Sequence, residues 1–145
     1  MNDFIEIQIL NAVRELLTGK VNELLGDLHF SIPLIEFSGY RGADVVVPVV
    51  SLSSCECSEK ERIIRLDAYS LTITFSLPEN EDSEFFCYAY GSVVSKAFEL
   101  NPTLGGIVDR AVVSWKKYNQ PKFANCGENW ELIISLRITV EGISN

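Results

Sequence analysis

Four cysteines and one histidine are the side chains of this 145-residue sequence best suited to bind a metal or act as a nucleophile. They are Cys55, Cys57, Cys87, Cys126 and His29. A structural zinc site takes four ligands, usually with cysteine pairs about two to four residues apart. Here one pair has a single-residue gap, and the other ligands are scattered along the chain. We therefore expect no metal site and interpret the cysteines as free thiols, two of them in and beside the end of a strand.

Catalysis by a serine or cysteine nucleophile requires a base within hydrogen-bonding distance, and that base is commonly histidine. His29 lies in "GDLHFSIPL", where apolar neighbours indicate a turn or a partly buried position. Cys126 lies in "NCGENW", which indicates a loop thiol. Because no acid, base and nucleophile come together in a motif, the sequence predicts no catalytic residues and no enzymatic activity.

Two further stretches resemble ligand-binding loops only in composition. The acidic "ENEDSE" (79–84) lacks the alternating Asp/Asn positions and the central glycine of a calcium loop, so we expect a helix start instead. The "LGG" at 104–106 follows a predicted helix and precedes a strand, whereas a phosphate-binding loop lies between a strand and a helix. The sequence therefore predicts neither a bound cation nor a nucleotide, and no cofactor.

One basic and aromatic cluster remains, formed by Lys116, Lys117 and Lys122 around Tyr118 and Phe123. Such a cluster can contact a phosphate backbone, form a solvated loop or belong to a protein interface. The sequence has 12 basic and 20 acidic residues, a formal net charge of −8, and tight nucleic-acid binding depends on clustered positive charge. We therefore favour a protein–protein interface, with DNA touched only in passing.

The length and the 47% hydrophobic content fit one globular domain spanning 1–145. No apolar run approaches the ~20 residues that a membrane span needs. The N-terminal stretch carries acids where a signal peptide carries a basic cluster, so we expect the chain to stay in the cytoplasm when it is made.

Hydrophobic periodicity predicts the first half of the fold. A stripe at spacings of three and four predicts a helix over about 2–25, bent or split at Thr18-Gly19. Short extended pieces follow at 34–40 and 44–54, and Pro48 places the second at a sheet edge or a bulge. We expect the acidic "CECSEKE" (55–61) to form a loop.

The second half has clearer patterns. Alternation predicts a strand over 63–77, and an amphipathic pattern predicts a helix over 83–100, capped by Asn80 or Asp82. Two more alternating strands are expected over 107–118 and 130–140, paired as an antiparallel hairpin with a long connection. The first of these would place Ala111, Val113 and Trp115 on one face.

A sharp corner is expected between that helix and the strand that follows it. Asn101 and Pro102 cannot continue the helix, and Gly105 and Gly106 adopt positive backbone angles readily. We interpret all four residues as structural, so the corner is not a binding site.

The order of elements predicts an α+β fold, an antiparallel (mixed) sheet of four to five strands with two helices packed on one face. The second face would then be open and rich in Ser, Thr, Arg and Glu. Val112 and Ile133 are apolar among these polar neighbours, and such a face is a natural surface for another subunit.

Four segments carry a resemblance to a known family: "RLDAYSLTITFSL", "SEFFCYAYGSVVSKAFEL", "NPTLGGIVDRAV" and "WELIISLRITVE". In these segments the sequence resembles the tail terminator (tail-completion) proteins of long-tailed bacteriophages. The N-terminal helix and the chain length are similar too, and "VVVPVVSLSSCECSEKE" fits least well.

The resemblance implies a non-enzymatic subunit of a phage or prophage virion, found in the host cytoplasm during assembly. Such subunits form a ring, usually a hexamer, that caps the head-proximal end of the tail tube and meets a head-completion or connector protein. Alternatives are another neck or tail-tube-related structural protein, or a cytoplasmic binding or adaptor module of similar fold. Six copies of −8 give −48, and an acidic ring lets DNA slide without sticking. We expect the Ser/Thr face or acidic loops to contribute to that lumen.

Overall fold

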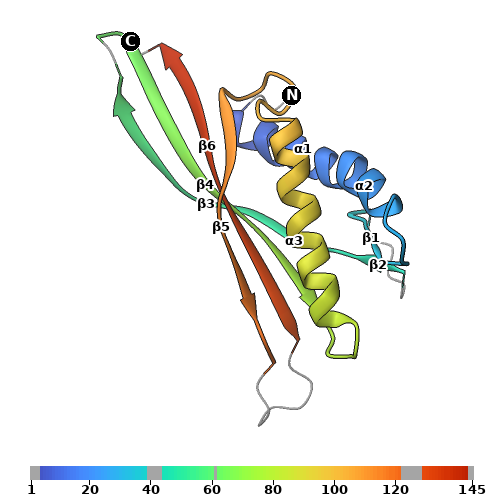
Figure 1. The fold of residues 1–145 in the computed structure, drawn as a ribbon. Helices are drawn as coiled ribbons and strands as arrows, with labels where there is room; N and C mark the ends of the chain where they lie inside the picture. The colour runs from blue at the N-terminus through green and yellow to red at the C-terminus, as the bar shows by residue number, and fades with distance from the viewer. Residues whose placement is uncertain (1–3, 39–43, 61, 122–128, 144–145) are drawn as a thin grey trace.

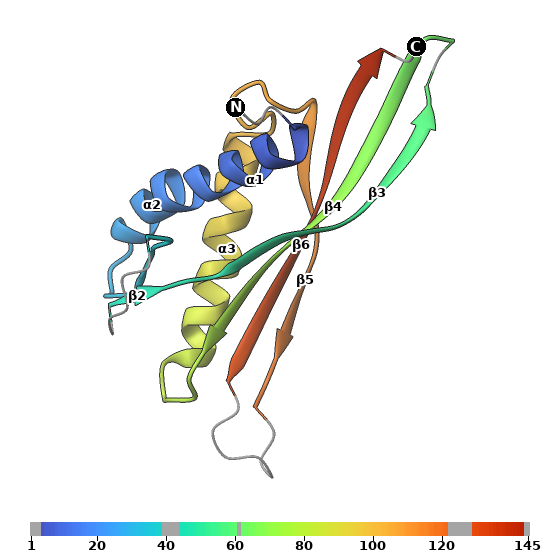
Figure 2. The same ribbon diagram turned by 180° about the vertical axis from the view of Figure 1, so that it is seen from behind.

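A four-stranded antiparallel sheet with helices on one face forms the α+β architecture of the computed structural model, which describes residues 4–38, 44–60, 62–121 and 129–143 (Figures 1 and 2). The strand order is β3-β4-β6-β5. The strands are β3 (Val49–Glu59), β4 (Ile64–Leu77), β5 (Arg110–Asn119) and β6 (Trp130–Ile143). A separate parallel pair joins β1 (Leu34–Ile35) to β2 (Val45–Val46). The predicted fold class is confirmed.

The central strands β4 and β6 supply most of the sheet's buried side chains. Alternate residues of each strand face the helices, and the pairing register sets Leu71 opposite Leu136 and Ile73 opposite Ile134. All four are essentially inaccessible to solvent. Burying such a side chain stabilises a fold by about 1.5–3 kcal/mol, so this face dominates the core. The alternation that predicts the strand over 63–77 is confirmed.

The first helical segment contains a π-helical turn at the predicted bend. It consists of α1 (Ile5–Leu16), a π turn (Leu17–Val21) and α2 (Asn22–Gly26). Its buried residues recur every four positions: Ile9, Val13, Leu17, Val21 and Leu25. A spacing of four overshoots the α-helical repeat of about 3.6 by roughly 40° per step, so the stripe would drift around a regular helix. The wider π turn corrects that drift and keeps the stripe on the core.

Helix α3 (Ser83–Leu100) has the bounds that its periodicity predicts. It packs against the sheet through Tyr90, whose ring stacks on Phe75 with centroids 4.7 Å apart. The predicted capping is wrong, because neither candidate side chain caps the helix. Asn80 accepts a hydrogen bond from the backbone N–H of Asp82, while the Ser83 hydroxyl donates to the Pro78 carbonyl. These contacts hold the turn before the helix instead.

The corner after α3 is confirmed. Gly105 and Gly106 have φ of 71° and 92°, and Leu104 precedes them with φ of 50°. The Ala111 N–H donates to the Pro102 carbonyl at 2.7 Å, which fastens the corner to the start of β5. Leu104 is buried, and this burial holds a side chain in a backbone region that favours glycine.

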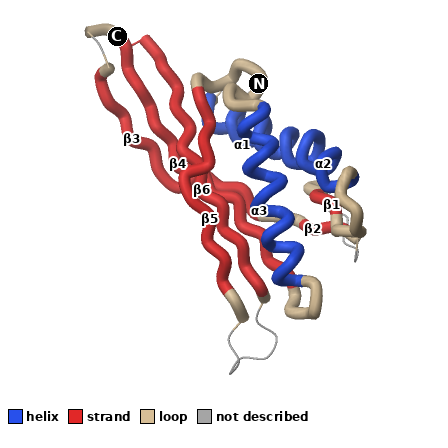
Figure 3. The backbone as a smooth tube through the Cα atoms, in the orientation of Figure 1, coloured by secondary structure: helices blue, strands red, loops and turns tan. Residues whose placement is uncertain are grey.

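The predicted loop at 55–61 is wrong over most of its length, because β3 continues to Glu59. Its backbone pairs with β4 as far as Glu59 opposite Arg65. Here β3, β4 and β6 extend beyond the helices (Figure 3). Side chains of β3 from Ser53 onward are exposed, so polar and acidic residues are tolerated in a strand that lacks the usual alternation.

The contact between α3 and β5 depends on Gly91. A Cβ added at Gly91 would lie 2.2 Å from the Tyr118 hydroxyl oxygen. We expect Gly91→Ala to lower the free energy of unfolding by roughly 1 kcal/mol, because displacing the Tyr118 ring costs about 1–3 kcal/mol and the helix-propensity gain returns about 1 kcal/mol of it. Urea denaturation measures the change.

Gly19→Ala is the matched control for that substitution. Nothing lies within 4 Å of a Cβ at Gly19, so this variant should keep or slightly raise stability. Equal stability changes for the two variants would contradict the close approach of Tyr118 to α3.

Candidate functional site

The sheet face turned away from the helices is the candidate site, and we call it the open face. Cross-strand rows place its side chains together. Its members include Val49 and Ser51 of β3; Ser70, Thr72 and Thr74 of β4; Ile133, Ser135, Arg137 and Thr139 of β6; and Arg110, Val112, Trp115 and Lys117 of β5. Hydroxyl side chains are the commonest kind among these residues and lie beside apolar and basic ones, which suits a face in contact with water or with a polar interface.

A β-bulge changes which residues of β5 reach the open face. The register of β5 against β6 shifts between Val113 and Trp115. The prediction that Trp115 shares the face of Ala111 and Val113 is therefore wrong, because the extra residue turns the indole to the other side. Trp115 pairs opposite Ser135 and is 51% exposed. The bulge thus adds a large aromatic ring to the open face.

The bulge also separates the basic residues predicted as one cluster. Lys117 pairs opposite Ile133 on the open face. Lys116 points to the other side, where its Nζ donates to the Gly91 carbonyl at 3.4 Å. Tyr118 also turns toward α3, with its ring centroid 5.1 Å from that of Tyr88. The prediction that Lys116, Lys117 and Tyr118 form one cluster is therefore wrong, and their place in a protein interface stays a prediction.

Two other members of that predicted cluster, Lys122 and Phe123, lie outside the described residues. The two apolar positions predicted for the interface are on the open face as expected. Val112 is 39% exposed, and Ile133 is half-buried beside Lys117.

Two arginines form a basic depression on the open face that the sequence did not single out. Arg110 and Arg137 line a depression of about 320 Å³ together with Val112, Ser114 and Thr139. Neither guanidinium forms an ion pair with another described residue. Arg137 pairs directly opposite Val112, so a charged and an apolar group lie side by side. The depression can accept a carboxylate next to an apolar side chain.

A groove follows the outer edge of β5. It has a volume of about 600 Å³ and lies between β5 and α3, with Phe98, Pro102 and Trp115 among its lining residues. Along this edge β5 has no strand partner in the described part of the chain. Beyond Ala111, whose N–H donates to the Pro102 carbonyl, backbone groups on such an edge can pair with an added strand.

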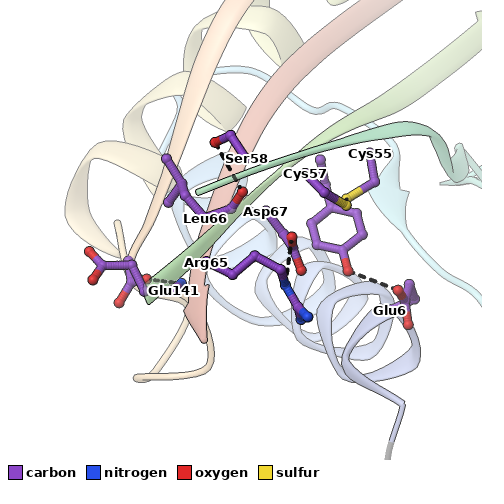
Figure 4. Close-up of polar contacts among 10 residues, drawn as sticks. Glu6, Cys55, Cys57, Ser58, Arg65, Leu66, Asp67 and Glu141 are labelled. Carbon is purple, nitrogen blue, oxygen red and sulfur yellow. Dashed lines mark hydrogen bonds and ion pairs between the residues drawn. The ribbon is translucent and has the colours of Figure 1, made fainter. Parts of the chain in front are cut away.

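The thiols occupy two environments. Cys87 is buried in α3, and burial raises its pKa to about 11. Cys55 and Cys57 are exposed on β3, with their sulfurs 3.8 Å apart (Figure 4). Hydrogen bonds with Asp67 and Cys55 raise the pKa of Cys57 to about 11. Cys126 lies outside the described residues, and His29 is exposed in the bend after α2.

Comparison with known proteins yields no relatives: no protein-family model matches the chain, and no curated protein matches it. Among the described helices, none has the length and apolar character to cross a membrane.

The two tryptophans report on opposite faces of the sheet. Trp130 is only 7% exposed on the helix-covered face, whereas Trp115 is 51% exposed. We expect acrylamide to quench the fluorescence of a Trp130→Phe variant, which retains Trp115, several-fold more strongly than that of a Trp115→Phe variant. Equal quenching would place the Trp115 indole back in the core and contradict the bulge.

Proposed function

We propose that this protein is a non-enzymatic, ring-forming virion assembly protein, a tail terminator that caps the head-proximal end of a phage or prophage tail tube. The observation that carries the proposal is the open face, where exposed Val112 and Trp115 lie in a polar surface. Burying such apolar side chains against another protein removes them from water, and this lowers the free energy of the complex. The open face alone indicates only a contact with some other protein. The four sequence segments that resemble tail terminators favour a contact between subunits of a ring.

The occupant of the open face in this proposal is a second copy of the chain. A ring forms when one surface of each copy binds a different surface of the next and the rotation closes. The basic depression at Arg110 and Arg137 would bind an acidic surface on the next copy. The net charge of −8 means that each copy has acidic residues to offer. The exposed turn before α3 supplies such a surface, with Glu79, Glu81 and Asp82. Opposite charges on the two surfaces favour a head-to-tail contact.

Acidic groups left outside the subunit contacts suit the ring's lumen. Excess negative charge there repels the DNA phosphates, so the polymer passes without binding. The head-completion protein and the tail tube protein would then bind the two rims of the ring.

A binding or adaptor module remains the second candidate function, favoured by the groove along the edge of β5. An extended peptide can add to an exposed sheet edge through main-chain hydrogen bonds. In that case the chain would be a monomer that binds a peptide segment of another protein, and the open face would not mediate self-association.

Light scattering across a concentration series separates the two candidates. We expect a species of the mass of a ring, and its fraction should rise with protein concentration. The ring should form either from the protein alone or on addition of tail tubes. A strict monomer under both conditions would contradict the ring.

Val112→Glu should weaken self-association at least tenfold, because it buries a charge in the proposed contact. Ile7→Glu is the matched control, since Ile7 is 37% exposed on α1 and Val112 is 39% exposed on the open face. Equal effects of the two substitutions would place the contact elsewhere.

Charge pairing at the basic depression gives a salt-dependent prediction. We expect Arg137→Ala to weaken self-association by roughly tenfold at low ionic strength and much less at high salt, because salt screens partly exposed pairs. Arg14→Ala, on the helix layer, removes the same charge away from the open face. Analytical ultracentrifugation at two salt concentrations measures both variants, and a salt-independent loss would argue against an ionic contact.

A further inference from the structure

Three side chains with metal-binding atoms converge where β3 runs beside β4. Cys55 and Cys57 are alternate residues of one strand, so their side chains lie on the same face. The register places Asp67 of β4 opposite Cys57 and Tyr69 opposite Cys55. The two sulfurs and a carboxylate oxygen of Asp67 all lie within 4.8 Å of one another. Figure 4 shows Cys55, Cys57 and Asp67 close together, with the Asp67 carboxylate joined to Arg65 by a dashed line.

We propose that Cys55, Cys57 and Asp67 bind a thiophilic divalent cation of the zinc class, with a further coordination position open to water or an added ligand. The distance between the sulfurs supports tetrahedral coordination. At a zinc–sulfur distance of about 2.3 Å, the tetrahedral angle sets two sulfur ligands roughly 3.8 Å apart. The sulfurs of Cys55 and Cys57 are 3.8 Å apart without any rearrangement.

Neighbouring groups hold the carboxylate in place. The Arg65 Nε donates to Asp67 Oδ1 at 3.1 Å, and Asp67 is only 9% exposed. A hydrogen bond of this kind orients a ligating carboxylate and leaves its second oxygen to the metal. On the side toward α1, the Tyr69 hydroxyl donates to Glu6 Oε2 at 2.8 Å. The site is therefore held by paired strands and supported by charged neighbours.

The donor set selects the class of cation. Thiolates are soft ligands that favour zinc and related metals, whereas magnesium and calcium take oxygen ligands. The exposure of Cys55 and Cys57 leaves an entry path, in contrast to buried Cys87. The sequence argued against a closed four-ligand site, and the third ligand found here comes from a different strand. A set of three protein ligands is the open type.

The test uses the reduced, metal-free chain carrying Cys126→Ser, titrated with Co²⁺ under anaerobic conditions and then with Zn²⁺. We expect one equivalent of cobalt to bind with the intense visible bands of a tetrahedral site and a thiolate charge-transfer band. Zinc should displace it. Octahedral cobalt, or no uptake by the reduced protein, would overturn the proposal.

Variants assign the ligands. Cys55→Ser and Cys57→Ser should each weaken zinc binding more than ~100-fold, and Asp67→Asn or Arg65→Ala by about tenfold or more. Cys87→Ala is the control and should leave the affinity unchanged, with circular dichroism confirming that every variant is folded. Unchanged affinity in both Cys55→Ser and Cys57→Ser would also overturn the proposal. Both readouts are independent of self-association, so they distinguish this site from the proposed ring.

Discussion

The antiparallel pairing of β4 with β6 is the constraint on which the other features of the molecule depend. The two strands pair over the whole of β4, from Ile64 opposite Ile143 to Leu77 opposite Trp130, without a bulge. A register shift of one residue would exchange the two faces of a strand. It would carry Leu71 and its neighbours into solvent and bring the hydroxyl face under α3. The core, the open face and the position of Asp67 are therefore all fixed by one register.

Local patterns in the sequence predicted the elements whose formation depends on neighbours along the chain. The alternation over 63–77, the helix over 83–100 and the reversal at Gly105 and Gly106 each depend on side chains or backbone angles within a few residues. The second helix has its predicted bounds, and the α+β class followed from the order of elements. Because these features depend on the types of nearby residues, they can be predicted from a single sequence.

Other features depend on a partner strand, and the sequence did not show them. The bulge that exposes Trp115 arises where β5 adjusts to β6, and no pattern within β5 marks it. The acidic, cysteine-bearing stretch 55–61 predicts a loop because it shows no alternation, whereas residues 55–59 continue β3 with side chains exposed on both faces. The meeting of Asp67 with Cys57 depends on register between segments that only folding brings together. Arg110 and Arg137 come together for the same reason.

The sheet is longer than the helical layer that covers it, and this difference in length has a mechanical consequence. Beyond Tyr69, the ends of β3, β4 and β6 project past the helices (Figure 2). They are held by main-chain hydrogen bonds and by the ion pairs of Arg65 with Asp67 and of Lys60 with Glu141. Such a ribbon bends more easily than the two-layer body, because fewer apolar contacts must be broken. The projecting strand ends can therefore bend to fit adjoining surfaces of different curvature, while the two-layer body keeps its shape.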